Sequence, residues 1–551
     1  MGSHRPPVYP YKPSPDQRRR GSPAHHPVII VGAGPVGLTV AADLATRGIA
    51  TVLLDEDDTV STGSRAICWS KRTLEIFDRL GCADPMVARG ITWSTGKVFR
   101  GTGQLYAFDL QSETGHRRPP FINLQQYLAE EMLVARVIEL GRTDLRWKNR
   151  VTGFQARADG VRLSVETPDG PYELDCGYLI AADGARSALR RLLGLEFRGR
   201  VFEDRFLIAD VRMKADFPTE RWFWFDPPFN PGQSALLHRQ ADDVWRIDLQ
   251  LGRDADPELE RTPERVLPRL RAMLGPDRPF ELEWVSVYTF QCRRLDRFRH
   301  GRVIFIGDAA HQVSPFGARG GNAGIQDADN LCWKLAAVLA GHAPEHLLDS
   351  YDAERGPAND ENILNSTRST DFITPKSKIS RAFRDAVLDL APRHAFARAM
   401  VNSGRLSVAA KNGHSALNTP DRDRFEDGAE PGTSCLDAPI IMGGRDGFLV
   451  DRVSTGGFVG LWFEDSPLPA ELAALAAAAV PVRTLRVGRD LVDREGLVRR
   501  RYDATQGTYY LFRPDAHVTA RWRRADAPAI AAARDRALGN DMATALRRAG
   551  E

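Results

Sequence analysis

Hydrophobic residues follow a strand, helix, strand pattern near the start of the chain. Residues 28–31 read Val-Ile-Ile-Val, an apolar β-branched run that predicts a short strand buried on both faces. Helical spacing of apolar residues follows over 36–47, and Gly48 ends it. Residues 50–54 predict a second buried strand. This order indicates a βαβ unit of a parallel sheet.

The same kind of buried strand recurs twice further along the chain. Residues 178–182 predict a strand that ends at Asp183, and residues 302–306 predict another that ends at Asp308. A helical pattern follows each acid, and the second helix is expected from Asn322. Each strand therefore carries a carboxylate to its C-terminal end, beside a helix N-terminus, where α/β sheets bind ligands.

Alternating patterns predict a second, strand-rich region over residues 200–295. The clearest strand spans 244–251, where polar and apolar residues alternate. One face would carry Trp245, Ile247, Leu249 and Leu251, and the other Arg246, Asp248 and Gln250. The polar face could either wall a cleft or lie in solvent, and the sequence leaves both open.

These patterns predict an α/β fold of several domains, because 551 residues exceed a single hydrophobic core. A Rossmann-like nucleotide-binding domain would hold an inserted strand-rich substrate domain, and a small α/β domain would follow. The N-terminal segment is rich in Pro, Arg and His and lacks the apolar region of a signal peptide. We expect a disordered leader (1–26), the main domain (27–400) with insertions at about 90–125 and 190–295, a linker (401–430) and the C-terminal domain (431–551).

Composition excludes several classes of partner. The chain is 42% hydrophobic and 27% charged, as soluble globular proteins are. Its 75 basic and 72 acidic residues leave a net charge of +3, which gives no indication of nucleic acid or an anionic membrane as a partner. No apolar run is long enough to span a membrane. The six cysteines show no C-x-x-C and no metal-ligand spacing, which favours reduced thiols in a cytoplasm and no metal site.

The glycines after the first strand have the spacing G-x-G-x-x-G. Gly32 would allow the tight turn, Gly34 the close approach of a pyrophosphate, and Gly37 the packing of the helix on the strand. Asp55, about twenty residues further on, stands where a ribose hydroxyl is normally held. The glycines alone are a weak signal, but strand, helix, strand and acid in register predict dinucleotide binding. Three strand ends in one sheet suggest a long ligand, and FAD suits them better than NAD.

Three motifs together resemble the single-component flavoprotein aromatic hydroxylases, most closely in layout those of the 3-(3-hydroxyphenyl)propionate hydroxylase type. They are residues 32–37, residues 182–187 (Ala-Asp-Gly-Ala-Arg-Ser) and residues 307–322, which begin Gly-Asp-Ala-Ala-His. Residues 509–522 also resemble the closing hairpin of the thioredoxin-like domain found in these enzymes. Since this domain has no C-x-x-C here, we expect it to serve packing or dimer contact rather than redox chemistry.

The resemblance implies an enzyme that uses FAD, NAD(P)H and O2 to hydroxylate a phenolic aromatic substrate through a flavin C4a-hydroperoxide. Baeyer–Villiger oxidation, epoxidation and oxidative removal of a ring substituent are alternative uses of the same cofactor. A flavin-binding protein without oxygenase activity is the alternative from another class. A small aromatic substrate is the expected partner, and a homodimer is common among the relatives.

The resemblance also assigns roles to individual residues. Asp55 would hold the adenosine ribose, Arg65 would approach the diphosphate, and Gln126 rather than Gln125 would be the family glutamine. Asp183 would contact FAD and the nicotinamide donor, and Asp308 a ribityl hydroxyl. The implied FAD contacts are Gly32, Gly34, Pro35, Val36, Gly37, Asp55, Glu56, Arg65, Gln126, Asp183, Asp308 and the amides around Gly320, Gly321 and Asn322.

Candidates on the substrate side are less specific. Tyr288 and Arg246 could orient or deprotonate the substrate, and His311 is a further candidate base. Trp222 and Trp224 would wall the pocket, with Pro315 beside the substrate ring. Except for Pro315, each of these has a purely structural explanation that is at least as good.

Overall fold

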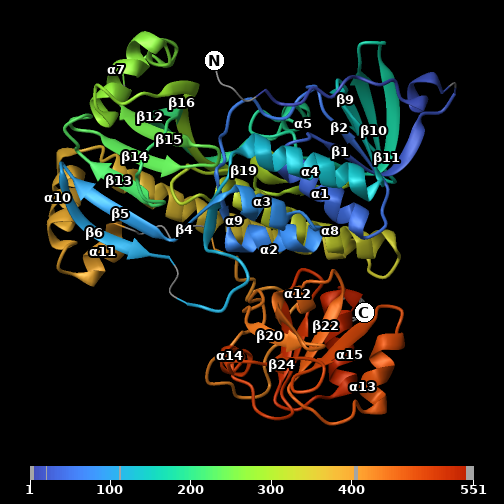
Figure 1. Cartoon of the computed structure of the whole chain (residues 1–551). Helices are drawn as coiled ribbons and strands as arrows, with labels where there is room; N and C mark the ends of the chain where they lie inside the picture. The colour runs from blue at the N-terminus through green and yellow to red at the C-terminus, as the bar shows by residue number, and fades with distance from the viewer. Residues whose placement is uncertain (1–4, 20, 111–112, 253, 402–407, 541–551) are drawn as a thin grey trace.

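The computed structural model describes residues 5–19, 21–110, 113–252, 254–401 and 408–540. Two large sheets and a smaller C-terminal unit make up the molecule (Figure 1). The first sheet has the strand order β17-β18-β11-β1-β2-β8, and β10 and β9 extend β11 as an antiparallel branch. Its strands are β1 (Ala24–Val31), β2 (Thr51–Leu54), β8 (Thr143–Arg146), β9 (Arg150–Ala156), β10 (Val161–Glu166), β11 (Tyr172–Ala181), β17 (Arg299–His300) and β18 (Val303–Phe305).

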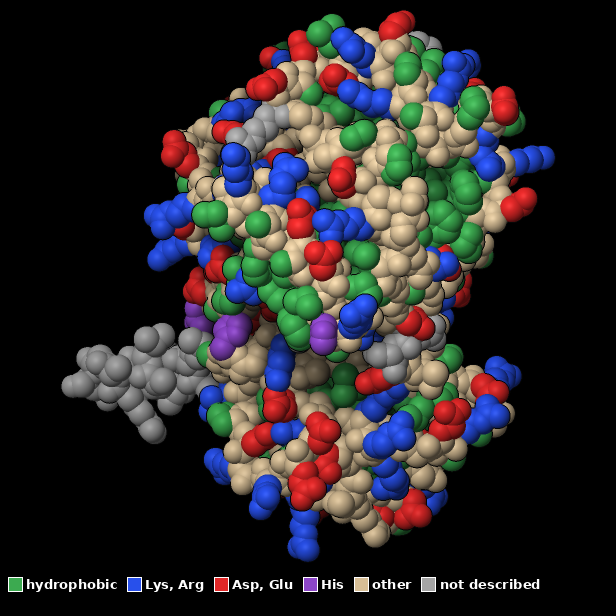
Figure 2. Space-filling view, turned by 90° about the vertical axis from the view of Figure 1, so that its left-hand side faces the viewer, with side chains coloured by type: hydrophobic (Ala, Val, Ile, Leu, Met, Phe, Trp, Pro, Cys, Tyr) green, Lys and Arg blue, Asp and Glu red, His purple; other side chains and the backbone are tan. Residues whose placement is uncertain are grey.

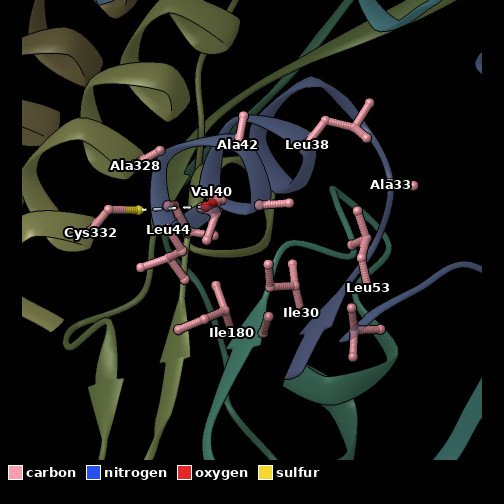
Figure 3. Close-up of a cluster of buried hydrophobic side chains, with 14 of the residues drawn as sticks. Ile30, Ala33, Leu38, Val40, Ala42, Leu44, Leu53, Ile180, Ala328 and Cys332 are labelled. Atoms are coloured by element: carbon pink, nitrogen blue, oxygen red, sulfur yellow. Dashed lines mark hydrogen bonds between the residues drawn. The ribbon is translucent and has the colours of Figure 1, made fainter. Parts of the chain in front are cut away.

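The predicted Rossmann-like arrangement is confirmed, because β8, β2, β1, β11 and β18 run parallel. Helix α1 (Pro35–Thr46) packs on β1 and β2 and contacts α4 (Gln126–Leu140) and α8 (Gly320–Leu339). Figure 3 shows Ile30, Leu53 and Ile180 of three strands under Leu38 and Val40 of α1. Further helices of this part are α2 (Lys71–Leu80), α3 (Ala83–Arg89), α5 (Ala188–Leu192) and α9 (Asp349–Ile373), with short 3-10 turns η2 (Gly307–Ala309) and η3 (Glu345–Leu348).

The second sheet has the order β19-β16-β12-β15-β14-β13-β5-β6. It unites the two segments that were expected as insertions, because β13 pairs with β5 in parallel. Its strands are β5 (Thr95–Arg100), β6 (Gly103–Asp109), β12 (Arg198–Arg212), β13 (Arg221–Phe225), β14 (Ser234–Arg239), β15 (Val244–Leu251), β16 (Glu281–Arg294) and β19 (His311–Gln312). Nearby lie α6 (Pro257–Glu260), α7 (Pro263–Leu274), α10 (Lys378–Leu390) and α11 (Ala395–Val401).

Each face of the second sheet has its own neighbours. Trp245, Ile247 and Leu249 of β15 pack with Val266 and Leu270 of α7 on one face, which we call the α7 face. The other face, here the inner face, packs on Phe316 of the loop before α8 and on Ile373 and Leu388 of α9 and α10. A small third sheet also contacts the second sheet, because Asn123 donates a hydrogen bond to the carbonyl of Arg239. The third sheet consists of β3 (Cys68–Ser70), β7 (Phe121–Asn123) and β4 (Ile91–Trp93).

The C-terminal unit has the predicted thioredoxin-like topology. Its central sheet has the order β23-β22-β25-β26, with β22 and β23 parallel and the other pairs antiparallel. The elements are β20 (Pro439–Met442), β21 (Arg445–Phe448), α12 (Val450–Val453), β22 (Phe458–Trp462), α13 (Ala470–Ala474), η4 (Leu475–Ala477), β23 (Val482–Arg486), β24 (Val492–Asp493), α14 (Leu497–Arg501), β25 (Tyr509–Phe512), β26 (Val518–Trp522) and α15 (Ala527–Ala537).

The N-terminal segment differs from the expected disordered leader. Tyr9 stacks on Trp147 with ring centroids 4.7 Å apart, and Arg146 donates a 2.5 Å hydrogen bond to Asp16. The 3-10 turn η1 (Pro15–Arg18) is closed by a capping box at Ser14. These contacts order the described part of the segment on the first sheet, and residues 1–4 and 20 lie outside the described residues.

The expected linker is also held in place where it is described. Ser415 donates a 2.5 Å hydrogen bond to Glu354 of α9, and Arg521 of β26 pairs with Asp421 at 2.7 Å. Residues 402–407 lie outside the described part of the chain. Basic and acidic side chains are mixed over the face seen in Figure 2. None of the described helices combines the length and the apolar composition needed to cross a membrane.

Candidate active site

The glycine-rich loop after β1 has the geometry of a nucleotide-binding turn. Gly32 has φ +105°, and a Cβ there would overlap the carbonyl oxygen of Ala182. A Cβ on Gly37 would overlap the carbonyl oxygen of Gly32. By contrast, a Cβ on Gly34 would meet no atom within 4 Å. Gly32 and Gly37 are therefore required by the fold itself, whereas Gly34 borders open space at the N-terminus of α1.

Asp55 closes the side of this loop. Its Oδ2 accepts a 2.5 Å hydrogen bond from the amide of Ala33, and its Oδ1 accepts one of 2.9 Å from Asp57. Burial raises the pKa of Asp55 to about 6. Glu56 is exposed. The carboxylate of Asp55 thus binds the turn at Ala33, between Gly32 and Gly34. This is the position where the expected FAD site would hold the adenosine.

The loop around Arg65 is fixed from two sides while Arg65 itself is exposed. The side-chain Oε1 of Gln126 accepts a 3.0 Å hydrogen bond from the main-chain amide of Ala66, and the main-chain amide of Gln126 donates one of 2.8 Å to Ser64 Oγ. Gln125 faces away and donates to the carbonyl of Ala241 at 2.9 Å. Gln126 is therefore the glutamine that faces this loop.

The other strand ends present carboxylates with unused acceptor capacity. Asp183 accepts a 3.0 Å hydrogen bond from Leu189, but its Oδ1 is buried without a partner among the described residues. Asp308 is exposed although residues 303–307 and 309–312 are buried. Burial nevertheless raises the pKa of Asp308. We infer that Asp308, an accessible side chain between buried neighbours, lies at a recess in the protein, here called the hollow.

The N-terminus of α8 lies next to this hollow. Gly324 packs so closely on α1 that a Cβ would lie 2.6 Å from Val36 Cγ2, which brings the starts of α1 and α8 together. The first amides of α8, at Gly320, Gly321 and Asn322, have no partner within the helix. They supply hydrogen-bond donors and positive potential for an anionic group.

The side chain of Asn322 has a structural role. Its Oδ1 accepts hydrogen bonds from Ser70 N and Thr73 Oγ1, at 2.9 and 2.7 Å. Its Nδ2 donates to the carbonyls of Cys68 and Ala318, at 2.8 and 2.6 Å. Because all four bonds join α8 to neighbouring segments, only the main-chain amide of Asn322 remains for a ligand.

A cavity of about 280 Å³ lies between the second sheet and the loop before α8. Phe223 and Phe225 of β13, Phe108 of β6 and Phe316 form much of its wall. Phe316 is adjacent in sequence to Pro315, which is exposed. Binding sites for small molecules are usually apolar with few polar groups, and this cavity has that character. Its position next to the α8 loop makes it the candidate substrate pocket.

The comparisons with known proteins agree with this arrangement. The FAD binding domain family matches residues 25–366. The chain belongs to the FAD binding domain family. It is 32% identical over 526 residues to the 6-methylpretetramide 4-monooxygenase of Streptomyces rimosus, with 92% of each chain covered. It is 29% identical over 519 residues to the 3-(3-hydroxy-phenyl)propionate/3-hydroxycinnamic acid hydroxylase of Mycolicibacterium smegmatis, with 90% of each covered.

A solved structure shows the same fold with ligands bound. The ternary complex of aklavinone-11 hydroxylase with FAD and aklavinone has a TM-score of 0.78 at 25% identity, and the match covers 94% of this chain and all of that one. The chain is thus an FAD-dependent monooxygenase. The open space beside Gly34, the exposed carboxylate of Asp308 and the unpartnered Oδ1 of Asp183 fit an extended cofactor.

In this monooxygenase, His311 is not placed to act as a base on the substrate. Its side chain is fully buried, and its Nε2 lies 2.5 Å from Asp327 Oδ2. Arg355 donates to the other oxygen of Asp327 at 2.6 Å. These two partners hold the pKa of Asp327 at about 2. His311 therefore connects its loop to Asp327 of α8 and, through Asp327, to Arg355 of α9. No sequence motif indicated the pair of His311 and Asp327, which lie 16 residues apart.

Trp222 and Trp224 lie on the α7 face, away from the cavity. Trp222 packs against Phe217 and Trp224, and both tryptophans belong to the same hydrophobic cluster as Trp245. Alternation along β13 places Arg221, Phe223 and Phe225 on the inner face instead. The sequence showed which residues share a face, but not which face would line the pocket.

Arg246 contacts the loop at Ser64 and Arg65 and does not line the cavity. Its guanidinium forms two 2.9 Å hydrogen bonds with Asp210 and also donates to the carbonyls of Ser64 and Arg65. The polar face of β15 is thus turned inward, not toward solvent. Tyr288 is half-buried near Asp308 and Arg65, whose charges both affect its pKa. Burial raises that pKa, so Tyr288 is neutral near pH 7 and can donate a hydrogen bond at this position.

Proposed function

We propose that this monooxygenase hydroxylates a phenolic aromatic substrate with O2 and NAD(P)H, and that the substrate binds in the cavity walled by Phe223, Phe225 and Phe316. The observation that carries the proposal is the position of this cavity. The cavity adjoins the loop at Phe316 and Gly317, and this loop leads into α8 near Asp308. The names of the two relatives described above, a monooxygenase and a hydroxylase of aromatic compounds, support the same reaction class.

FAD, when bound, supplies the oxidising chemistry: it accepts a hydride from NAD(P)H and activates O2. We infer that Asp55, Arg65, Gln126 and Asp183 hold its adenosine and diphosphate end. Asp308 would bind a hydroxyl of its linking chain, and the amides of residues 320–322 would stabilise negative charge on its ring.

The chain's other residues would control access and orientation. The aromatic wall excludes water from the reacting oxygen and orients the flat substrate ring. Tyr288, near Asp308 and Arg65, is placed to donate a hydrogen bond to a substrate oxygen at the junction of hollow and cavity. We propose that Pro315 borders this junction. The mixed surface charge and buried thiols suit a cytoplasmic protein, and a homodimer is the assembly we propose.

A spectrum and an oxidation assay test this function. The purified protein should take up FAD and become yellow, and phenols should accelerate NAD(P)H oxidation with consumption of O2. The product should carry one additional oxygen atom by mass spectrometry. A colourless protein that does not bind FAD would refute the proposal. Oxidation of NAD(P)H that no aromatic compound accelerates would favour a flavoprotein without oxygenase activity.

A further inference from the structure

The inner face of the second sheet carries a group of charged residues that the proposed roles leave unexplained. Strand register places Arg221 of β13 opposite His238 of β14, and His238 opposite Arg246 of β15. Arg246 in turn lies opposite Asp210 of β12. Asp248 follows two positions after Arg246, on the same face. Four adjacent strands therefore bring these five polar side chains together inside the protein.

Only part of this group is internally paired. Asp210 and Arg246 satisfy one another with two hydrogen bonds. Arg221 and Asp248 are close enough for each charge to affect the other's pKa. Yet among the described residues neither of them forms an ion pair within 4 Å or a side-chain hydrogen bond, and Asp248 Oδ1 is buried without a partner. Buried carboxylates and guanidinium groups are rarely left without a hydrogen-bond or ion-pair partner, because removing them from water costs much free energy.

The location of the two residues connects them with the substrate. Arg221 lines the cavity beside Phe223 and Phe225. Asp248 retains accessible surface although protein surrounds it, as Asp308 does. Asp248 lies on the inner face of β15, so its accessible side faces the same side of the sheet as the cavity. A polar group of a bound ligand could reach both residues from that side.

We propose that Asp248 and Arg221 bind the phenolic hydroxyl of the substrate, Asp248 as the base that accepts its proton and Arg221 as the cation that stabilises the phenolate. This inference rests on the proposed function. In the step, the phenol O–H bond breaks, an O–H bond forms on the Asp248 carboxylate, and the electron pair remains on the phenolate oxygen beside Arg221. The more electron-rich ring then reacts more readily with an electrophilic oxygen.

The electrostatics of the group are consistent with this role. Burial raises the pKa of Asp248 to about 6, so it is mostly ionised at pH 7 yet basic enough to accept a proton. The groups that face it are Asp210 of β12, Arg221 of β13, His238 of β14, Arg246 of its own strand and Cys68 of β3. Burial and the two arginines keep the pKa of His238 well below its usual value, so His238 is neutral and does not compete for the proton.

Ligand ionisation tests the proposal directly. 4-Fluorophenol and 6-fluoro-2-naphthol would be titrated into the FAD-loaded enzyme, and 19F NMR would report whether the bound form is phenol or phenolate. The wild type should bind a probe as phenolate at a pH at least one unit below that needed in solution. Asp248→Asn should abolish this shift, and Arg221→Gln should reduce it, with partial recovery in Arg221→Lys.

Controls separate this effect from misfolding. Asp277→Asn and Arg265→Gln change exposed residues near or on α7 and should behave as wild type. Flavin content and melting temperature would show that each variant is folded. An unchanged shift in Asp248→Asn would overturn the proposal, as would wild-type binding of the neutral phenol only, or failure of the wild type to bind either probe.

Kinetics gives a second readout that a structural role would not produce. If a phenol is turned over, kcat/KM of the wild type should rise with pH through about 6, because Asp248 must be ionised. Asp248→Asn should lose this rise and fall by about 100-fold or more. If no phenol is hydroxylated but the NMR shift depends on Asp248, the proposed function fails while the binding site stands.

Discussion

At the scale of the residue, Gly32 and Gly37 of the glycine-rich loop are required by the fold, whereas we expect Gly34 to be required only for cofactor binding. Gly37→Ala should destabilise the protein, because its Cβ would overlap the carbonyl of Gly32. Gly34→Ala should leave the melting temperature of the FAD-free protein unchanged, since its Cβ meets nothing within 4 Å and its φ of −74° suits alanine. FAD titration should nevertheless show an affinity at least about tenfold lower, equal to about 1.4 kcal/mol. Unchanged FAD affinity in Gly34→Ala would place the diphosphate elsewhere.

Asp327 should make part of the stability depend on pH. Its lowered pKa of about 2 means that it stabilises the fold above its unfolded pKa of about 4, and that this stabilisation is lost as the pH falls through about 2. Asp327→Asn should therefore lower the free energy of unfolding by about 2 kcal/mol or more at pH 7. Urea unfolding of both proteins between pH 7 and pH 2 should show this difference shrinking below pH 4. A difference that does not change with pH would contradict the ion-pair account.

The sequence predicts some residues of the site better than others. Asp55, Asp183 and Asp308 are predictable because each stands directly after a buried apolar run or one glycine beyond it, and strand ends are the sites where α/β sheets expose side chains. Arg221 and Asp248 were missed as a pair. They lie on strands that are neighbours only through β14, and no local pattern encodes which strands become neighbours.

At the scale of the element, α8 depends on β3 for its position. The four hydrogen bonds of Asn322 join the start of the helix to residues 68–73 and Ala318. At about 1 kcal/mol each, their loss in Asn322→Ala should cost about 4 kcal/mol of stability. The variant should also bind FAD more weakly, because the α8 amides would no longer be held in place. Urea unfolding and FAD titration measure the two effects, and stability within 1 kcal/mol of wild type would contradict this role.

The second sheet shows why alternation alone could not locate the pocket. From the sequence, the polar face of β15 could lie in solvent or face the protein interior, because both arrangements give the same alternation of polar and apolar residues. What decides between them is α7, whose Val266 and Leu270 cover the apolar face. The helix-forming pattern of α7 was visible in principle, but the side of the sheet that it covers depends on tertiary packing.

At the scale of the whole molecule, a buried ion network joins the C-terminal unit to the FAD-binding part. Arg513 of the hairpin turn after β25 pairs with Glu354 of α9 at 2.6 Å and with Asp515 at 2.7 Å, and all three side chains are fully buried. Lys334 of α8 also pairs with Glu354, at 2.8 Å. Arg513 and Lys334 lower the pKa of Glu354. These charges thus help to hold the thioredoxin-like unit on α8 and α9, next to the hydrophobic contact of Trp333 with Phe458.

Removing one partner from this network should be costly. Arg513→Met would leave Glu354 and Asp515 with too little positive charge, at a cost of about 3–5 kcal/mol. Limited proteolysis should then cleave faster within residues 408–430. Arg494→Met, which breaks the exposed pair with Asp446, is the matched control and should change little. Equal stability of the two variants would show that the buried network does not couple the two parts.

Isotope labelling tests directly whether this monooxygenase transfers oxygen from O2 to a phenol. The FAD-loaded enzyme would be incubated with NAD(P)H, a panel of phenols and 18O2, and the products analysed by mass spectrometry. We expect a hydroxylated phenol with one labelled oxygen, formed in step with NAD(P)H oxidation and O2 uptake. Oxidation of NAD(P)H that yields only hydrogen peroxide with every phenol, and no labelled organic product, would contradict it.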